Sequence, residues 1–116
     1  MMQTVVETPE FIRCAKRLDL SDDERESIID LISSNPEVGN EISGTSGMRK
    51  VRIAGKGKGK SGGYRVITFF TGSDIPVFLI TIYRKGQKAN ITAAEKKVMK
   101  ILSNAIIEIY RSKEDE

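Results

Sequence analysis

Glycine and lysine alternate in the middle of the chain, where Gly55 to Lys60 reads Gly-Lys-Gly-Lys-Gly-Lys. Glycine lets a backbone approach a phosphate group without an intervening Cβ, and the ammonium groups of Lys56, Lys58 and Lys60 can follow a polyanion as point charges. The pattern therefore predicts a flexible hairpin loop that binds nucleic acid and that supplies no catalytic group by itself. The alternative interpretation is an exposed loop whose lysines serve only solubility.

Two nucleotide-binding motifs nearly match this segment. The Walker loop ends in Gly-Lys-Ser, which Gly59-Lys60-Ser61 supplies, but Ala54 occupies the position of its first glycine. Residues 57–62 also fit the dinucleotide-binding pattern GxGxxG. Both motifs require a helix directly after the loop, because the helix N-terminus binds the phosphate, whereas residues 64–71 favour a strand. We therefore reject both motifs and expect no cofactor.

Cations and tyrosines flank this segment and recur after the last predicted strand. Single-stranded RNA needs such a mixture, because its bases stack on aromatic rings while positive charges hold its phosphates. If the strands pair in sequence order, these groups can gather around one end and one face of the sheet. Either tyrosine can instead pack in the core or at its rim, and this alternative is stronger for Tyr64 than for Tyr83. The residues concerned are Arg49, Lys50, Arg52, Tyr64, Arg65, Tyr83, Arg84, Lys85 and Lys88.

Charge is distributed unevenly along the chain. From Met48 to Lys88 there are ten basic residues and one acid, Asp74, a local net charge of +9, whereas the remainder has nine basic and fifteen acidic residues. This asymmetry indicates a polyanionic partner, with a solvated basic face as the alternative. Histidine is absent and Cys14 is the only cysteine, which excludes serine-histidine and cysteine-histidine catalysis, histidine-metal sites and an internal disulfide. We find no secretion signal or membrane-spanning run and expect a cytoplasmic protein.

The N-terminal third predicts a short strand and two helices. Residues 3–7 favour the strand, and Thr8-Pro9-Glu10 is typical of a helix start, with a capping side chain before proline at the first helical position. We expect this helix to run to about Leu18. A capping box at Ser21 to Glu24 and an apolar stripe predict a second helix, which ends before Asn35-Pro36.

The rest of the chain predicts three consecutive antiparallel strands and a helix. Strand patterns begin at Met48 and cover residues 64–71 and 76–84, and a capping box at Thr92 to Glu95 opens the helix. One face of this helix is apolar and comprises Val98, Ile101, Leu102, Ala105, Ile106 and Ile109. We expect this face to pack on the sheet; the alternative is that a protein partner holds or displaces the helix.

The predicted order is β-α-α-β-β-β-α. We therefore expect one α+β domain over residues 1–116, in which helices flank one antiparallel sheet, with a charged tail that frays from Arg111.

Three segments, residues 44–52, 55–67 and 79–84, closely resemble the HigB branch of the RelE/ParE toxin superfamily, and Gly-Lys repeats followed by Gly63-Tyr64-Arg65 are the most specific part. The resemblance implies the toxin of a type II toxin-antitoxin pair, which enters the ribosomal A site, cuts mRNA there and so inhibits translation. It also implies a helix-turn-helix antitoxin, through which alone the toxin would meet operator DNA. The related ParE proteins instead poison DNA gyrase. A non-catalytic RNA-binding module is a third possibility.

The resemblance also assigns roles to residues. RNA carries its own nucleophile, the 2′-hydroxyl, so the protein must align the attack, stabilise phosphoryl charge and move protons, which requires neither histidine nor metal. By analogy, Arg65 stabilises the phosphate transition state, Arg84 or Lys85 protonates or neutralises the leaving group, and Tyr83 stacks a base or transfers a proton. Several family members have a catalytic tyrosine where this chain has Ile91 and Thr92, which leaves the general base unassigned; a lysine crowded by cations is one candidate.

Overall fold

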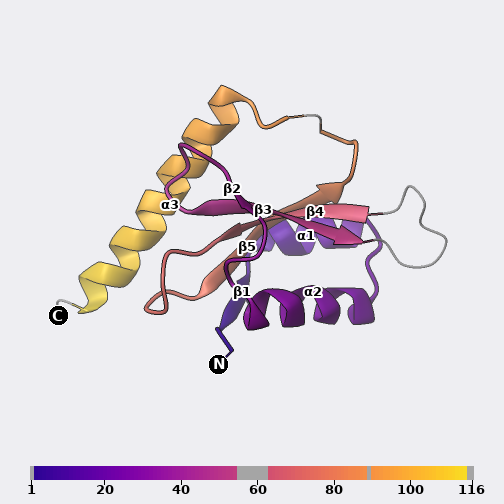
Figure 1. The fold of residues 1–116 in the computed structure, drawn as a ribbon, viewed down its shortest axis with the longest axis horizontal. Helices are drawn as coiled ribbons and strands as arrows, with labels where there is room; N and C mark the ends of the chain where they lie inside the picture. Colours follow the sequence, from indigo (N-terminus) through magenta and orange to yellow (C-terminus); the bar gives the residue numbers. More distant parts are fainter. Residues whose placement is uncertain (1, 55–62, 89, 115–116) are drawn as a thin grey trace.

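The computed structural model describes residues 2–54, 63–88 and 90–114. Five strands form one sheet in the order β1-β5-β4-β3-β2, with α1 and α2 on one face and α3 across the other (Figure 1). The predicted α+β class is confirmed. The elements are β1 (Val5–Glu7), α1 (Pro9–Arg17), α2 (Asp22–Ser34), β2 (Asn40–Glu41), β3 (Met48–Ala54), β4 (Gly63–Phe69), β5 (Val77–Arg84) and α3 (Ala93–Glu114).

The sheet differs from the prediction in two respects. The meander β3-β4-β5 is antiparallel, as predicted, but β1 pairs with β5 in parallel, so the sheet is mixed. Two helices separate β1 from the meander and allow the chain to return in the same direction, which a tight hairpin cannot do. The second difference is β2, a two-residue strand that pairs with β3 through Asn40 and Lys50. This strand is too short and too polar to show the alternation of apolar and polar residues by which a strand is recognised in a sequence.

The predicted helix starts are confirmed. Pro9 begins α1, and the capping box places the Glu24 N–H 3.1 Å from the Ser21 hydroxyl, while the Ser21 N–H donates to the Glu24 carboxylate at 3.0 Å. Each cap satisfies N–H groups that a helix end leaves without partners, which stabilises a helix by about 1 kcal/mol.

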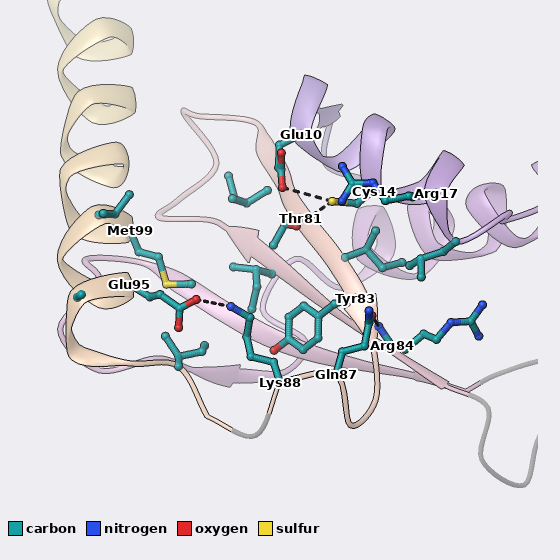
Figure 2. A pocket seen from close by; sticks show the side chains of 17 residues that line it. Glu10, Cys14, Arg17, Thr81, Tyr83, Arg84, Gln87, Lys88, Glu95 and Met99 are labelled. Atoms are coloured by element: carbon teal, nitrogen blue, oxygen red, sulfur yellow. Dashed lines mark hydrogen bonds and ion pairs between the residues drawn. The ribbon is translucent and has the colours of Figure 1, made fainter.

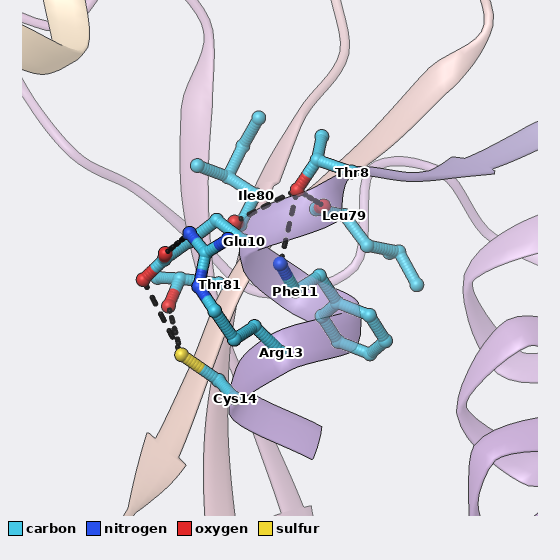
Figure 3. Close-up of polar contacts among 8 residues, drawn as sticks. All are labelled: Thr8, Glu10, Phe11, Arg13, Cys14, Leu79, Ile80 and Thr81. Carbon is cyan, nitrogen blue, oxygen red and sulfur yellow. Dashed lines mark hydrogen bonds and ion pairs between the residues drawn. The ribbon is translucent and has the colours of Figure 1, made fainter. Parts of the chain in front are cut away.

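Thr8 fixes α1 against β5 (Figure 3). Its hydroxyl oxygen accepts the Phe11 N–H at 3.2 Å, and its hydroxyl proton can go to the carbonyl of Leu79, at 2.8 Å, or of Ile80, at 3.0 Å. One turn further on, the Cys14 Sγ lies 3.6 Å from the Thr81 hydroxyl. The helix cap therefore also positions α1 beside the half of β5 that leads to Tyr83.

The buried side chains form one core on each face of the sheet. The core beneath α1 and α2 contains Phe11, Ala15, Ile28, Ile32, Val51, Val66, Val77, Leu79 and Ile82. The core beneath α3 contains Ile42, Met48, Ile67, Phe69, Ile75 and Ile106. The central strand β4 supplies both, because successive side chains of a strand point to opposite faces.

The prediction that the six apolar residues of α3 pack on the sheet was largely wrong. Of the six residues expected to pack, Ile106 is buried, whereas Val98, Ile101 and Ile109 are 65%, 70% and 56% exposed. The residues that contact the core form a neighbouring stripe: Met99, Ile106, Ile107 and Tyr110. Apolar residues occupy a wide arc of the α3 surface, and the sheet contacts only one part of that arc.

The C-terminal part of α3 also departs from the prediction. The helix continues through Glu114, beyond Arg111, where we expected fraying, and Arg111 lies 3.8 Å from Asp74 as an ion pair. No helix among the described residues has the length and apolarity needed to cross a membrane.

Candidate nucleic-acid interface

Three of the predicted site residues form a row across the adjacent strands β3, β4 and β5, near the end of the sheet where β3 ends and β4 begins. Arg52 of β3 lies opposite Arg65 of β4, and Arg65 lies opposite Tyr83 of β5. Side chains directly opposite each other share a face and have Cβ atoms about 5 Å apart. Tyr83 packs against the α3-side core, which places the row on that face. Two opposed guanidinium groups repel each other, so an anion bound between them would be favoured.

The environment of Tyr83 keeps its hydroxyl protonated. Burial raises the pKa of Tyr83, whereas the positive charges of Lys88 and Arg65 lower it and the charge of Glu95 raises it. Because burial has the largest effect, the phenol is neutral at physiological pH. It can donate a hydrogen bond to an anionic oxygen, but it is unsuited to act as a base.

Lys88 forms an ion pair with Glu95 next to Tyr83 (Figure 2). The Glu95 carboxylate also accepts the Thr92 N–H at 2.9 Å, and the Thr92 hydroxyl accepts the Glu95 N–H at 3.1 Å, which completes the predicted capping box of α3. The hydrogen bond from Lys88 is the main reason that the pKa of Glu95 falls to about 2. A predicted RNA-binding residue is thus held by the start of α3, a contact that the sequence pattern did not indicate.

A cavity of about 770 Å³ adjoins these residues between α1, β5 and the start of α3 (Figure 2). Its apolar lining includes Ile67, Ile80, Ile82, Ile91 and Met99, and its charged lining consists of Glu10, Arg17, Arg84, Lys88 and Glu95. Cys14 also lines it. Sequence reasoning missed the contribution of α1, since nothing in the sequence of that helix indicates that it lies beside β5.

The structure does not bring all predicted residues to one face. Tyr64 packs against the core beneath α1 and α2, and Arg84 lies directly opposite Tyr64 in the strand pairing. The Arg49 guanidinium donates to the carbonyl oxygens of Glu37, at 3.1 Å, and Gly39, at 3.4 Å. The prediction of a single face is therefore wrong for these residues, because each lies an odd number of positions along its strand from Arg52, Arg65 or Tyr83 and so faces the other side of the sheet.

The remaining predicted residues have different positions. Lys50 lies opposite Ile67 and so shares the face of Arg52. Lys85 follows the end of β5 as an exposed residue, where its N–H donates to the Gly63 carbonyl at 3.0 Å. Three further predicted residues, Lys56, Lys58 and Lys60, lie outside the described residues. Within the part of the chain that the structure describes, no group of three or more histidine, cysteine, aspartate or glutamate side chains could hold a metal ion.

Comparison with known proteins places the chain in a family. The family model described as the RelE toxin of the RelE/RelB toxin-antitoxin system matches residues 3–115. The chain belongs to the RelE toxin family. Membership implies a cognate antitoxin as a partner.

A solved structure supports the same fold. The chain is similar to the E. coli toxin RelE, studied as a double arginine mutant in the free state, with 18% sequence identity and a TM-score of 0.51. The match covers 88% of this chain and 97% of the E. coli chain. At this identity the likeness concerns the fold, and the RelE-like architecture predicted from the sequence is confirmed.

Proposed function

We propose that this RelE-family toxin is a metal-independent endoribonuclease that cuts mRNA in the ribosomal A site and thereby inhibits translation. The observation that carries the proposal is the row of Arg52, Arg65 and Tyr83 on one face of the sheet, beside a cavity with an apolar lining. Two cations and a protonated phenol next to an apolar surface suit a phosphate and the unstacked base attached to it.

The RNA supplies the nucleophile, and these side chains supply charge stabilisation and a hydrogen-bond donor. The 2′-oxygen attacks the adjacent phosphorus and the bond to the 5′-oxygen breaks, which leaves a 2′,3′-cyclic phosphate and a 5′-hydroxyl. Arg65 would neutralise the charge that develops on the non-bridging oxygens, and the Tyr83 hydroxyl would donate to one of them. The leaving 5′-oxygen takes up a proton or has its charge neutralised, and the candidates at the end of β5 are Lys85 for protonation and Arg84 for neutralisation, because a guanidinium keeps its proton. The 2′-hydroxyl proton leaves to a base that stays unassigned.

Glu95 is a poor candidate for that base. A carboxylate with a pKa of about 2 holds a proton weakly, and the Lys88 ammonium occupies it. We assign Glu95 the role of positioning Lys88 beside Tyr83.

The proposed partners follow from the same assignment. The resemblance of residues 44–52 and 55–67 to the HigB branch favours a helix-turn-helix antitoxin, with operator DNA contacted through the toxin-antitoxin complex. The proposed target, a translating ribosome, places the activity in the cytoplasm.

The test is primer extension on a defined mRNA bound to purified ribosomes, with the same mRNA free in solution as the comparison. New 5′ ends within codons, formed in the presence of ribosomes, are expected. A second mRNA with a single 2′-deoxy substitution at the mapped position should resist cleavage there, because the nucleophile is missing. Intact message would refute the proposal, and intact message with loss of DNA supercoiling in cells would favour a ParE-like action on gyrase.

A further inference from the structure

One edge of β5 is open beside the cavity. Parallel pairing with β1 covers Val77 to Leu79, after which the chain turns at Thr8 into α1. Among the described residues, no strand pairs with the remainder of β5 on this side. The cavity therefore reaches from α1, past the edge of β5, to the start of α3 (Figure 2).

The charges around this cavity are unequally neutralised. Its two carboxylates are both paired, Glu10 with Arg13 and Glu95 with Lys88. Two arginines that also line it, Arg17 and Arg84, form no ion pair with any described residue. Within the part of the chain that the structure describes, the rim of the cavity therefore carries one guanidinium on α1 and another at the end of β5 that form no ion pair. The hydrogen bond from Arg13 is the main reason that the pKa of Glu10 is lowered, and the positive charge of Arg17 also lowers it.

The cavity combines this charge with an apolar lining. Ile80, Ile91 and Met99 offer a surface on which a flat, unpaired base can lie. A volume of about 770 Å³ falls within the range of roughly 300–1,000 Å³ that is usual for pockets that bind small molecules. Apolar walls flanked by guanidinium groups suit a nucleotide of single-stranded RNA, whose base has apolar ring faces and whose phosphate is anionic.

We propose that Arg17 binds a backbone phosphate of the substrate RNA and that the cavity holds the base of the adjoining nucleotide. The RNA then crosses the open edge of β5 and does not end at the row formed by Arg52, Arg65 and Tyr83. This inference rests on the proposed function, and it adds α1 to the substrate-binding surface. Arg17 acts here as a binding residue and takes no part in the chemistry.

The test compares Arg17→Ala with Lys16→Ala, a matched control on the same turn of α1 that removes an exposed charge outside the cavity lining. Binding to a fluorescein-labelled, 2′-O-methylated RNA hexamer, which cannot be cut, is followed by fluorescence anisotropy as NaCl is varied. Each phosphate contact on single-stranded nucleic acid contributes about 0.7 to the slope of log affinity against log salt. Arg17→Ala should therefore weaken binding and lower the slope by about 0.7, whereas Lys16→Ala should leave the slope unchanged.

The possible results distinguish failure of this inference from failure of the proposed function. If the wild type binds RNA and Arg17→Ala binds with the same affinity and slope, Arg17 has no phosphate contact, and its guanidinium is left for another anionic partner such as an acidic protein. Equal losses in both variants would show a general effect of charge and would also overturn the inference. If the wild type fails to bind and fails to cut ribosome-bound mRNA, the proposed function falls, and the inference with it. Thermal unfolding of each variant verifies that the fold is retained.

Discussion

Replacing Arg65 by alanine should separate activity from stability. Arg65 is half-buried on β4, and among the described residues its guanidinium makes one hydrogen bond, to the Tyr64 carbonyl at 3.3 Å. Losing that long hydrogen bond costs at most about 1 kcal/mol of unfolding free energy. Removing the charge also relieves repulsion with Arg52, which lies directly opposite. The net change in stability should stay within about 1 kcal/mol, a shift in Tm of no more than about 4–8 °C.

The same substitution should remove most of the catalysis. Loss of a group aimed at transition-state charge typically lowers kcat by about 100- to 1,000-fold, equivalent to roughly 3–4 kcal/mol of the activation barrier. Arg65→Lys should fall between the wild type and Arg65→Ala, because it retains the charge but loses the planar fork that contacts two phosphate oxygens. The assay is single-turnover cleavage of ribosome-bound mRNA, with the Tm of each variant measured in parallel.

Arg49→Ala is the matched control. This arginine lies on β3, three residues from Arg52, and its guanidinium donates to the carbonyls of Glu37 and Gly39. It should lose stability with little change in the cleavage rate of the folded protein, the reverse of Arg65→Ala. Cleavage at the wild-type rate by folded Arg65→Ala, or parallel losses of activity and Tm in that variant, would refute the assignment of Arg65 to the phosphate.

Four further predictions concern other parts of the molecule. In Glu95→Gln, Lys88 loses its ion-pair partner, whereas the amide oxygen can still accept the Thr92 N–H. RNA should therefore bind more tightly and with a steeper salt dependence in anisotropy titrations, and an unchanged slope would contradict this. The lowered pKa of Glu95 gives stability that is present above pH 4.5 and is lost as the pH falls towards about 2, so acid unfolding of the wild type and of Glu95→Gln should converge there. Phe11→Ala empties a fully buried site and should lower the unfolding free energy by about 3–5 kcal/mol in urea titrations, whereas alanine at the 70% exposed Ile101 should cost less than about 1 kcal/mol. Tyr83 should ionise above pH 10 in an ultraviolet absorbance titration, measured as the difference between the wild type and Tyr83→Phe. The stability that the neutral phenol contributes should be lost as the pH rises through the raised pKa of Tyr83. A midpoint below pH 10 would contradict the conclusion that burial dominates the pKa of Tyr83.

Local features of the sequence determined most of the secondary structure. The caps at Thr8 and Ser21 and the capping box before α3 were predictable because a cap depends on residues within one turn. Period-2 patterns predicted the three strands of the meander. The basic centre of the chain and the Gly63-Tyr64-Arg65 segment also indicated the family, since charge and motif are properties of the sequence itself.

Tertiary structure alone decided which of these groups meet. Pairing register placed Arg52, Arg65 and Tyr83 in one row and Tyr64 on the other face, because a shift of one residue reverses the face on which a side chain lies. The parallel pairing of β1 with β5 brought α1, and with it Arg17, to the open edge of β5. The stripe of α3 that packs depended on where the helix crosses the sheet. These contacts join residues far apart in the sequence, and the packing of the whole chain, which no local pattern encodes, selects them.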